Sequence, residues 1–274
     1  MAKKHLITEE DFITALNKVI KKNDKVIVLY SGLWSFIFNV RFKNKSIPKK
    51  ILEIVESVVG KNRTLLLPSF SGEEFLTKKK FHLDKSLDKN GLLPAVALKS
   101  KKYYRTHQPL HSYLAFGKHV NEIKKLKLKT SWGRNSIFQW LSKKNARLCV
   151  MGVPWNKGCS YLHRYEELNR VPWRYFKIFK GEMFDRGKKI GMCMERKYST
   201  VPNLKYDLNP LVKEIAKKNF LKFNSKKFFL QSLTCKQIDK ASVKFFKKNS
   251  WKIIKNQIEI KNLLKKNDFL NFNL

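Results

Sequence analysis

The sequence predicts an α/β fold with a central mixed, largely parallel sheet flanked by helices. Short runs rich in leucine and β-branched residues, which indicate buried strands, alternate with segments of helical periodicity. Strand, helix and strand follow one another between residues 25 and 70, an order typical of a parallel βαβ unit. The chain has 274 residues, 43% of them hydrophobic, and shows neither a repeat nor a linker. We therefore expect a single domain over 1–274, with a small subdomain in its last quarter as the alternative.

The N-terminal third is expected to alternate two helices with two strands. Helices over 9–20 and 48–59 have apolar residues three and four positions apart, and a threonine or a proline stands where each begins. Strands over 25–33 and 63–70 are continuous apolar runs punctuated by a glycine or a proline. The segment 78–102 is basic and aperiodic, so we expect it to be irregular.

The same patterns predict further elements later in the chain. We expect, in order, a helix at 136–144, strands at 146–153, 174–179, 189–194 and 228–233, and a helix at 236–247. Directly after the strand at 146–153 comes the polar stretch CSYLHRYEEL, residues 159–168. It combines an imidazole with two carboxylates in a chain otherwise rich in lysine, which makes it either a polar helix start or a site.

The charge balance favours anionic partners. Lysine and arginine number 59 against 21 aspartates and glutamates, so the formal net charge is +38. A field of this sign attracts polyanions, nucleic acid among them. The lysines, however, are spread along the whole chain with abundant Asn, Ile and Phe, as an A/T-rich coding sequence would produce. We expect only non-specific association with nucleic acid, and keep a basic nucleic-acid-binding α/β protein as the alternative function.

Neither a metal nor a membrane is indicated by the sequence. The four cysteines stand far apart without a C-x-x-C pair, so they read as free thiols. His163 and Glu166 have His-x-x-Glu spacing, but no second metal ligand at helical spacing accompanies them. No run of 18 apolar residues occurs, and the N-terminus turns acidic before any apolar stretch develops. We expect a cytoplasmic protein that needs no metal.

Four stretches, taken in order, carry a family resemblance. VLYSGLWSF is similar to a strand ending in His-Ser-Ser-Leu, and TLLLPSF to a Thr-Leu-hydrophobic-Pro-Thr-Phe strand. RTHQPLHSYLAFG is similar to Arg-Ser/Thr-x-His-Pro-x-x-Ser-x-x-Ala-x-Gly. WGRNSIFQWL and LCVMGVPWNKGCSYLHRYEE are similar to a Gly-x-x-Ser helix start, a strand ending in Gly, and a Ser/Thr-x-x-His-x-x-Glu turn. Over roughly residues 8 to 185 the chain thus resembles the aminoglycoside N3-acetyltransferase family, which has the antibiotic N-acetyltransferase fold.

The resemblance implies an enzyme that moves an acetyl group from acetyl-CoA to an amine, usually on a sugar. At the matched positions the chain retains the family's residues Arg105, Pro109, His111, Ser112, His163 and Glu166. It departs from the pattern at Tyr30 and Gln108, where histidine is usual. These two departures concern the acyl-donor pocket and leave a third reading open, a family member that has lost catalysis.

Acetyl transfer to nitrogen requires a group that accepts the proton of the amine. Histidine is suited to this role because its ordinary pKa lies near neutrality, and a carboxylate beside it can fix its tautomer. His163 and Glu166 stand three positions apart, so a helix would place both on one face. We expect His163 to be the general base, with Glu166 or Glu167 orienting it or binding the amine. The alternative is a surface histidine beside first-turn glutamates.

The donor CoA carries phosphates, and the middle of the chain is suited to anions. No acidic residue occurs between Glu122 and Glu166, while lysine and arginine are frequent there. Gly133 and Ser136 stand just before a helix, whose free N–H groups can bind phosphate, although an ordinary serine cap explains Ser136 equally well. The expected cofactor-binding residues are these two and, from the resemblance, Tyr30, Ser31, Arg105 and Ser112.

The acceptor is expected to be a small amine. His111 and Glu167 are the expected substrate-binding residues, and acidic residues gather downstream of His163 at Glu166, Glu167, Glu182, Asp185 and Glu195. Two acceptor classes stay open: aminoglycosides, and amino sugars used in the synthesis of polysaccharides or other glycoconjugates. A strongly positive protein repels polycationic aminoglycosides and attracts a nucleotide-linked amino sugar, which favours the second class.

Overall fold

The computed structural model describes residues 6–42, 46–85, 91–217, 220–225 and 228–266. Its α-helices are α1 Glu9–Val19, α2 Ile47–Val59, α3 Gly72–Lys78, α4 Leu92–Lys99, α5 Val120–Lys124, α6 Ile137–Lys143, α7 Trp155–Gly158, α8 Arg164–Leu168, α9 Asn209–Ala216, α10 Cys235–Asn249 and α11 Gln257–Lys265. Its strands are β1 Val26–Ser31, β2 Thr64–Pro68, β3 Lys80–His82, β4 Tyr104–Arg105, β5 Tyr113–Gly117, β6 Arg147–Met151, β7 Arg174–Asp185, β8 Lys188–Thr200, β9 Leu221–Asn224 and β10 Phe229–Thr234.

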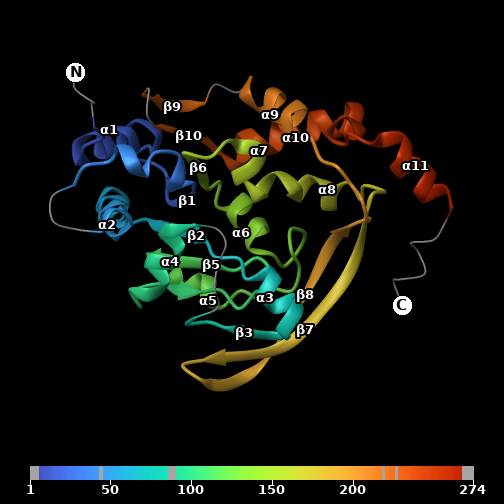
Figure 1. The fold of residues 1–274 in the computed structure, drawn as a ribbon, viewed down its shortest axis with the longest axis horizontal. Coiled ribbons are helices and arrows are strands. Elements are labelled where there is room, and N and C mark those ends of the chain that lie inside the picture. The colour runs from blue at the N-terminus through green and yellow to red at the C-terminus, as the bar shows by residue number, and fades with distance from the viewer. Residues whose placement is uncertain (1–5, 43–45, 86–90, 218–219, 226–227, 267–274) are drawn as a thin grey trace.

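A seven-stranded mixed sheet forms the centre of the structure, in the order β4-β5-β2-β1-β6-β10-β9 (Figure 1). β1 pairs in parallel with β2 and with β6, whereas the outer pairs are antiparallel. The predicted α/β fold with a central mixed sheet is confirmed. Its parallel part is confined to the three middle strands, because β5 and β10 add to their edges in the opposite direction. The last quarter of the chain supplies β9 and β10 to this same sheet.

Side chains that alternate along the central strands divide the core between the two faces of the sheet. On β1, Val28 and Tyr30 pack into the cluster shared with α6 and α10, whereas Ile27 and Leu29 pack into the cluster shared with α1, α2 and α4. These four side chains are at most 3% exposed. Burial on both faces explains why the strands appear in the sequence as continuous apolar runs.

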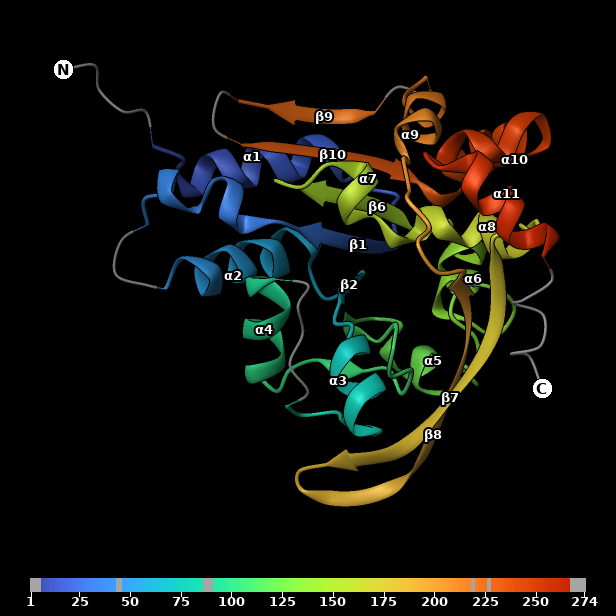
Figure 2. The ribbon, with the colours of Figure 1, turned by 45° about the vertical axis from the view of Figure 1, so that its right-hand side comes forward.

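β7 and β8 form a long antiparallel hairpin that extends away from the main sheet (Figure 2). Near its tip, β3 pairs in parallel with β7, and a small apolar cluster that includes Phe75, Phe81 and Met183 packs beneath it. Toward its other end, the backbone of Arg196 exchanges hydrogen bonds of 2.8 and 3.0 Å with residues 129 and 131. The hairpin is therefore attached to the main body at two places along its length.

Most of the elements expected from the sequence are present, although the strands expected at 174–179 and 189–194 extend to Asp185 and Thr200. The main exception is the segment 78–102, which contains β3 and α4 and is not irregular. The sequence of α4, LLPAVALK, is apolar on all sides, so it shows no helical period. Its Pro94 lies in the first turn, where a missing N–H breaks no helical hydrogen bond. Among the residues described, no helix combines the length and the apolar composition that a membrane crossing requires.

Candidate active site

A short turn followed by a helix carries the predicted histidine and glutamate. Residues Ser160–His163 form a 3₁₀ turn that leads directly into α8. His163 and Glu166 therefore project toward each other, and His163 Nδ1 lies 2.6 Å from Glu166 Oε1. Of the two glutamates that the sequence offers to the histidine, Glu166 is the one in contact.

Glu166 is fully buried and accepts hydrogen bonds from several elements. Besides His163, its carboxylate accepts from Arg174 Nε at 2.9 Å, from Trp173 Nε1 at 2.9 Å and from the Tyr206 hydroxyl at 2.7 Å. Burial alone would raise the pKa of Glu166, but the Arg174 guanidinium and His163 outweigh it and hold that pKa well below its usual range. The carboxylate is therefore ionised and fixed in position.

A second histidine–glutamate pair lies nearby. His111 Nδ1 is 2.6 Å from Glu195 Oε1, and the same carboxylate accepts from the Ser131 hydroxyl at 2.8 Å and from the backbone N–H of Leu110 at 2.8 Å. Burial lowers the pKa of His111, although Glu195 acts in the opposite direction. Burial raises the pKa of Glu195, but His111 and Ser131 outweigh it, so the net shift is downward. At neutral pH this pair is a neutral imidazole held by a carboxylate.

One cavity connects the two histidines. The Trp132 ring stands between them, with ring centroids 4.7 Å from His111 and 5.8 Å from His163. The cavity measures about 380 Å³ and is bordered by both imidazoles and by Trp132. Its wall is completed by Ser160, Arg174, Lys197, Ser199, Thr200 and Tyr206. The cavity can therefore expose a group bound in it to either histidine ring.

The wall of this cavity carries cations, and no carboxylate is among the described residues that line it. The charge of Arg174 is balanced by Glu166 at 2.9 Å. Lys197 lies on β8 and forms no ion pair with any residue that the structure describes. Burial lowers the pKa of Lys197, with Glu195 acting in the opposite direction. The unbalanced positive charge at the cavity therefore belongs to Lys197.

Glu167, an expected substrate-binding residue, lies away from this cavity. Its Oε2 accepts from the backbone N–H of Trp132 at 3.2 Å, and the carboxylate also accepts from the N–H of Gly133. Burial raises the pKa of Glu167 against the effect of these donors. Glu167 lines a separate cavity together with Gly133, and the structure does not bring it to His163.

Gly133 and Ser136, the residues expected to bind phosphate at the start of α6, both form hydrogen bonds within the protein. Ser136 caps the helix: its Oγ accepts from the N–H of Gln139 at 3.1 Å and donates to the carbonyl of Gly133 at 2.7 Å. Ser136 is 2% exposed. The N–H of Gly133 donates to Glu167, so that donor is already used, and phosphate binding at the start of α6 stays a prediction.

Tyr30 and Ser31 stand at the end of β1. Tyr30 is 3% exposed, and its hydroxyl lies 3.0 Å from that of Tyr113 and 3.5 Å from that of Ser160, which lines the cavity. The Ser31 hydroxyl is buried and has no hydrogen-bond partner among the described residues. This end of β1 is therefore directly behind the cavity wall, and a donor-binding role for Tyr30 and Ser31 stays a prediction.

Arg105 and Ser112 are buried next to each other on β4 and just before β5. Arg105 Nε donates to the Ser112 hydroxyl at 3.2 Å, and Arg105 Nη2 donates to the carbonyl of Ser69 at 2.7 Å. Gln108, one of the departures from the family pattern, is also buried, and its Nε2 donates to the carbonyl of Thr130. These contacts join loops behind the cavity, and cofactor binding by Arg105 and Ser112 likewise stays a prediction.

The acidic residues downstream of His163 do not form an acidic acceptor surface. Glu166 and Glu195 are each 0% exposed and bonded to a histidine. Glu167 lines the separate cavity, and Glu182 lies toward the hairpin tip in an ion pair of 2.6 Å with Lys189. Closeness in sequence did not predict closeness in space, because β7 carries the chain away from α8.

Several residues of the site were not predicted. Arg174, Lys197 and Tyr206 reach the cavity from β7, β8 and the loop after β8. Arg174 belongs to the stretch VPWRYFKIFKG, whose pattern gives no reason to single out the arginine. Trp132 directly precedes Gly133 in the WGRNS motif and is the member of this group that the motif could have indicated.

Comparison with known structures shows the same fold. The chain superposes on a structure described as AAC-IIIb binary with CoASH with a TM-score of 0.72 and 17% identity, over 88% of this chain and 96% of that chain. It superposes on the aminoglycoside acetyltransferase AAC(3)-IIb with a TM-score of 0.72 and 14% identity, over 89% and 98%. It superposes on the YokD protein from Bacillus subtilis with a TM-score of 0.68 and 14% identity, over 88% of this chain and 93% of that chain. Comparison with the sequences of curated proteins gives no match.

The sequence itself matches a family profile, that of aminoglycoside 3-N-acetyltransferase, over residues 41–234. This range is more than half of the 274 residues and contains both histidine–glutamate pairs of the cavity. The resemblance drawn from four short motifs is confirmed. The chain belongs to the aminoglycoside 3-N-acetyltransferase family, whose members use acetyl-CoA to acetylate an amine.

Proposed function

We propose that this chain transfers the acetyl group of acetyl-CoA to the amine of an amino sugar or aminoglycoside, with His163 as the general base and Glu166 as the residue that positions it. The observation that carries the proposal is the 2.6 Å contact between His163 Nδ1 and a fully buried carboxylate, on a ring that borders a cavity. His163 is 24% exposed at its side chain, so it is reachable while its partner is not.

The contacts of the ring favour one tautomer. Glu166 is ionised and can only accept, so at 2.6 Å the proton belongs on His163 Nδ1. Arg174 Nη2 also lies 3.2 Å from Nδ1, but it cannot donate to a nitrogen that carries a hydrogen, and its donors serve Glu166. The lone pair is then on Nε2, the nitrogen that remains to accept a proton.

The proposed step moves one acyl group and one proton. The amine nitrogen attacks the thioester carbonyl, a C–N bond forms, and the C–S bond to CoA breaks. The proton lost by nitrogen passes to His163 Nε2 and from there to the departing thiolate, so base and acid are the same group. The charge that develops on the imidazolium is stabilised by Glu166, which is already ionised and in place.

Among acceptors, the cavity is better suited to an amine on an anionic molecule. Solved structures of related enzymes contain a gentamicin or sisomicin, which are polycations. Here the lining includes Arg174 and the uncompensated Lys197 and no described carboxylate. We propose a nucleotide-linked or otherwise phosphorylated amino sugar as the preferred acceptor, because its anionic group is attracted by Lys197.

The test is a free-thiol release assay with acetyl-CoA over a panel of amino sugars and aminoglycosides. We expect His163→Ala to lose about 10²–10⁴-fold in kcat while the Kd for acetyl-CoA changes less than about twofold. His107→Ala is the matched control, because His107 is an exposed histidine outside the cavity lining. Unchanged turnover of His163→Ala would refute the assignment. Acetyl-CoA binding without thiol release on any acceptor would favour a member that has lost catalysis.

The positioning role of Glu166 needs a readout that a structural role would not move. Glu166→Gln keeps the shape of the side chain but removes its negative charge and one of its two acceptor oxygens, so a protonated His163 ring loses its counter-charge. We expect kcat to fall and the acid limb of its pH profile to shift, because the imidazolium loses its stabilising carboxylate. Glu167→Gln is the control, since its amide oxygen can still accept from Trp132 N–H. Equal pH profiles for wild type and Glu166→Gln would contradict this role.

A further inference from the structure

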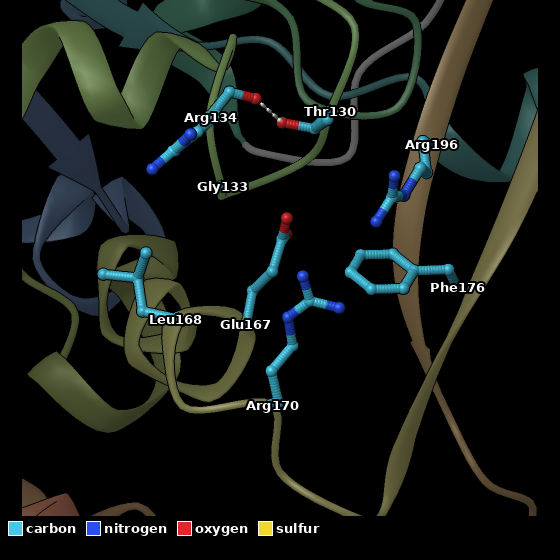
Figure 3. Close-up of a pocket in the computed structure, with 8 residues that line it drawn as sticks. All are labelled: Thr130, Gly133, Arg134, Glu167, Leu168, Arg170, Phe176 and Arg196. Carbon is cyan, nitrogen blue, oxygen red and sulfur yellow. Dashed lines mark hydrogen bonds between the residues drawn. The ribbon is translucent and has the colours of Figure 1, made fainter.

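A second cavity lies on the other side of the segments that build the histidine site. It measures about 530 Å³ and is bordered by the loop before α6, by the end of α8 and by the hairpin (Figure 3). Its lining residues are Thr130, Gly133, Arg134, Glu167, Leu168, Arg170, Phe176 and Arg196. None of them borders the cavity of His163.

Neighbouring residues in the sequence divide between the two cavities. On β8, Arg196 lines the second cavity and Lys197 lines the histidine cavity, as strand alternation requires. On α8, Glu167 lines the second cavity, while Glu166 holds His163. The two cavities therefore lie back to back, and a group bound in the second one would not itself contact His163 or His111.

The second cavity carries three arginines, of which Arg196 acts on the charge of Glu167 without forming an ion pair with it. The guanidinium groups of Arg134, Arg170 and Arg196 form no ion pair or hydrogen bond with any residue that the structure describes. The Nε atom of Arg196 is buried without a hydrogen-bond partner. A buried unpaired donor on a charged group is costly unless a ligand completes it. The donors of this cavity are therefore available for an anion.

An aromatic ring holds two of these arginines in place. The Arg196 guanidinium lies 3.6 Å from the centroid of the Phe176 ring, and the Arg170 guanidinium lies 5.2 Å from the same centroid. Figure 3 shows both groups converging beside that ring, with Glu167 next to them. Stacking on an aromatic face fixes the plane of a guanidinium and leaves its N–H edge free. The two planar guanidinium groups are therefore ordered before a ligand binds.

Glu167 does not neutralise the arginines. It is one carboxylate against three guanidinium groups, and its oxygens accept from the N–H groups of Trp132 and Gly133. Burial raises its pKa, which further weakens it as a counter-charge. The cavity is left with an excess of positive charge at a place where the protein supplies no other anion among the described residues.

We propose that this second cavity binds the phosphate or diphosphate group of a small phosphorylated ligand. The N–H groups of an arginine guanidinium can donate two parallel hydrogen bonds to the oxygens of a phosphate. A cavity of this size holds a nucleotide or a sugar phosphate. Two substrates could supply such a group: CoA and a nucleotide-linked acceptor. The proposal concerns binding and does not depend on the reaction proposed for His163.

Calorimetric titration with inorganic pyrophosphate at fixed ionic strength tests this proposal. We expect Arg196→Met and Arg170→Met each to weaken pyrophosphate binding by at least about tenfold. Arg170 lies on an exposed turn, so its variant remains informative if Arg196→Met fails to fold. Arg186→Met removes the same charge at the exposed hairpin tip, outside the cavity, and should change binding less than about twofold.

Parallel titrations with CoA and with UDP identify the source of the phosphate. Loss of CoA binding in both arginine variants would support a site for the phosphates of CoA, and loss of UDP binding with CoA binding kept would support a site for the acceptor. Pyrophosphate affinity that is unchanged in Arg170→Met and Arg196→Met would overturn the proposal. So would an equal loss in Arg186→Met, because that result would mean attraction by net charge alone.

Discussion

His163 and His111 have the same contact but different surroundings. Each has its Nδ1 2.6 Å from a buried glutamate, yet the side chain of His163 is 24% exposed and that of His111 only 9%. Burial lowers the pKa of His111, so its neutral form persists to more acid pH. His111 is therefore suited to hydrogen bonding in the cavity, whereas the more accessible ring of His163 is suited to exchange protons with a substrate.

The buried state of His111 makes stability depend on pH. In the folded chain its pKa lies below 6.5, the value expected when unfolded, so in the window just below pH 6.5 the unfolded chain binds more protons. The free energy of unfolding should fall as pH decreases through this window, by up to ~1.4 kcal/mol per pH unit for one such group. Glu166 and Glu195, whose pKa values are held below 4.5, lose their contribution only at more acid pH.

Urea unfolding at a series of pH values measures this slope. His111→Asn should make it shallower in the window below pH 6.5, because one of the histidines whose pKa burial lowers is removed. Ser199→Ala, a change at a lining residue without a titratable group, should keep the wild-type slope. A slope that is the same in His111→Asn and in wild type would contradict the buried neutral state of His111.

At the scale of elements, the sequence predicts local features well. The buried strands β1, β2 and β6 appear as apolar runs because both faces of the sheet are covered. The His163–Glu166 pair was predictable because both residues belong to one turn and a short helix, where spacing fixes geometry. α4 was missed because a helix that is apolar on all sides shows no period.

The remaining site residues depend on tertiary structure. Glu195 reaches His111 across 84 positions, and Tyr206 reaches Glu166 across 40. Nothing in the local sequence specifies that the long hairpin returns to α8, so neither contact follows from periodicity or composition. The acidic residues after His163 are close in sequence, but their separation in space is set by the same tertiary structure, so sequence order does not predict an acceptor site.

The hairpin that supplies Glu195 approaches the rest of the protein closely at Gly181. A Cβ atom at this position would lie 2.3 Å from the carbonyl oxygen of Lys79 and 2.5 Å from the Phe75 ring. Gly181→Ala should therefore lower the free energy of unfolding by about 1–3 kcal/mol, through overpacking of β7 against α3 and the residue that precedes β3. It should also raise the KM for the acceptor, because β8 carries Lys197 and Ser199 into the cavity.

Denaturant unfolding and steady-state kinetics check both parts of this prediction. Gly187 at the hairpin tip is the matched control, since a Cβ there meets nothing within 4 Å. Its φ of +80° favours Asn over Ala, so Gly187→Asn is the control variant and should stay close to wild type in both assays. If Gly181→Ala were as stable as Gly187→Asn, the hairpin would not be anchored at β3 as described.

For the whole molecule, the distribution of acidic residues matters more than their number. Glu166 and Glu195 are buried against histidines, and Asp24 forms a partly buried ion pair of 2.8 Å with Arg147. Carboxylates used inside the protein contribute little to the surface, whereas the lysines remain largely at the surface. The surface therefore carries most of the net charge of +38, and Lys197 adds a positive charge at the histidine cavity.

This field predicts opposite salt responses for the two acceptor classes. With a nucleotide-linked amino sugar, kcat/KM should fall several-fold as salt rises to physiological ionic strength, where the Debye length is about 8 Å, because long-range attraction is screened. With gentamicin, any measurable kcat/KM should rise over the same range, because screening removes repulsion. Thiol release measured at varied salt concentration distinguishes the two, and a free amino sugar with one amine serves as the weakly charged control. If gentamicin were the better acceptor even at low salt, carboxylates not found at the cavity would have to bind it, and the anionic-acceptor assignment would be wrong.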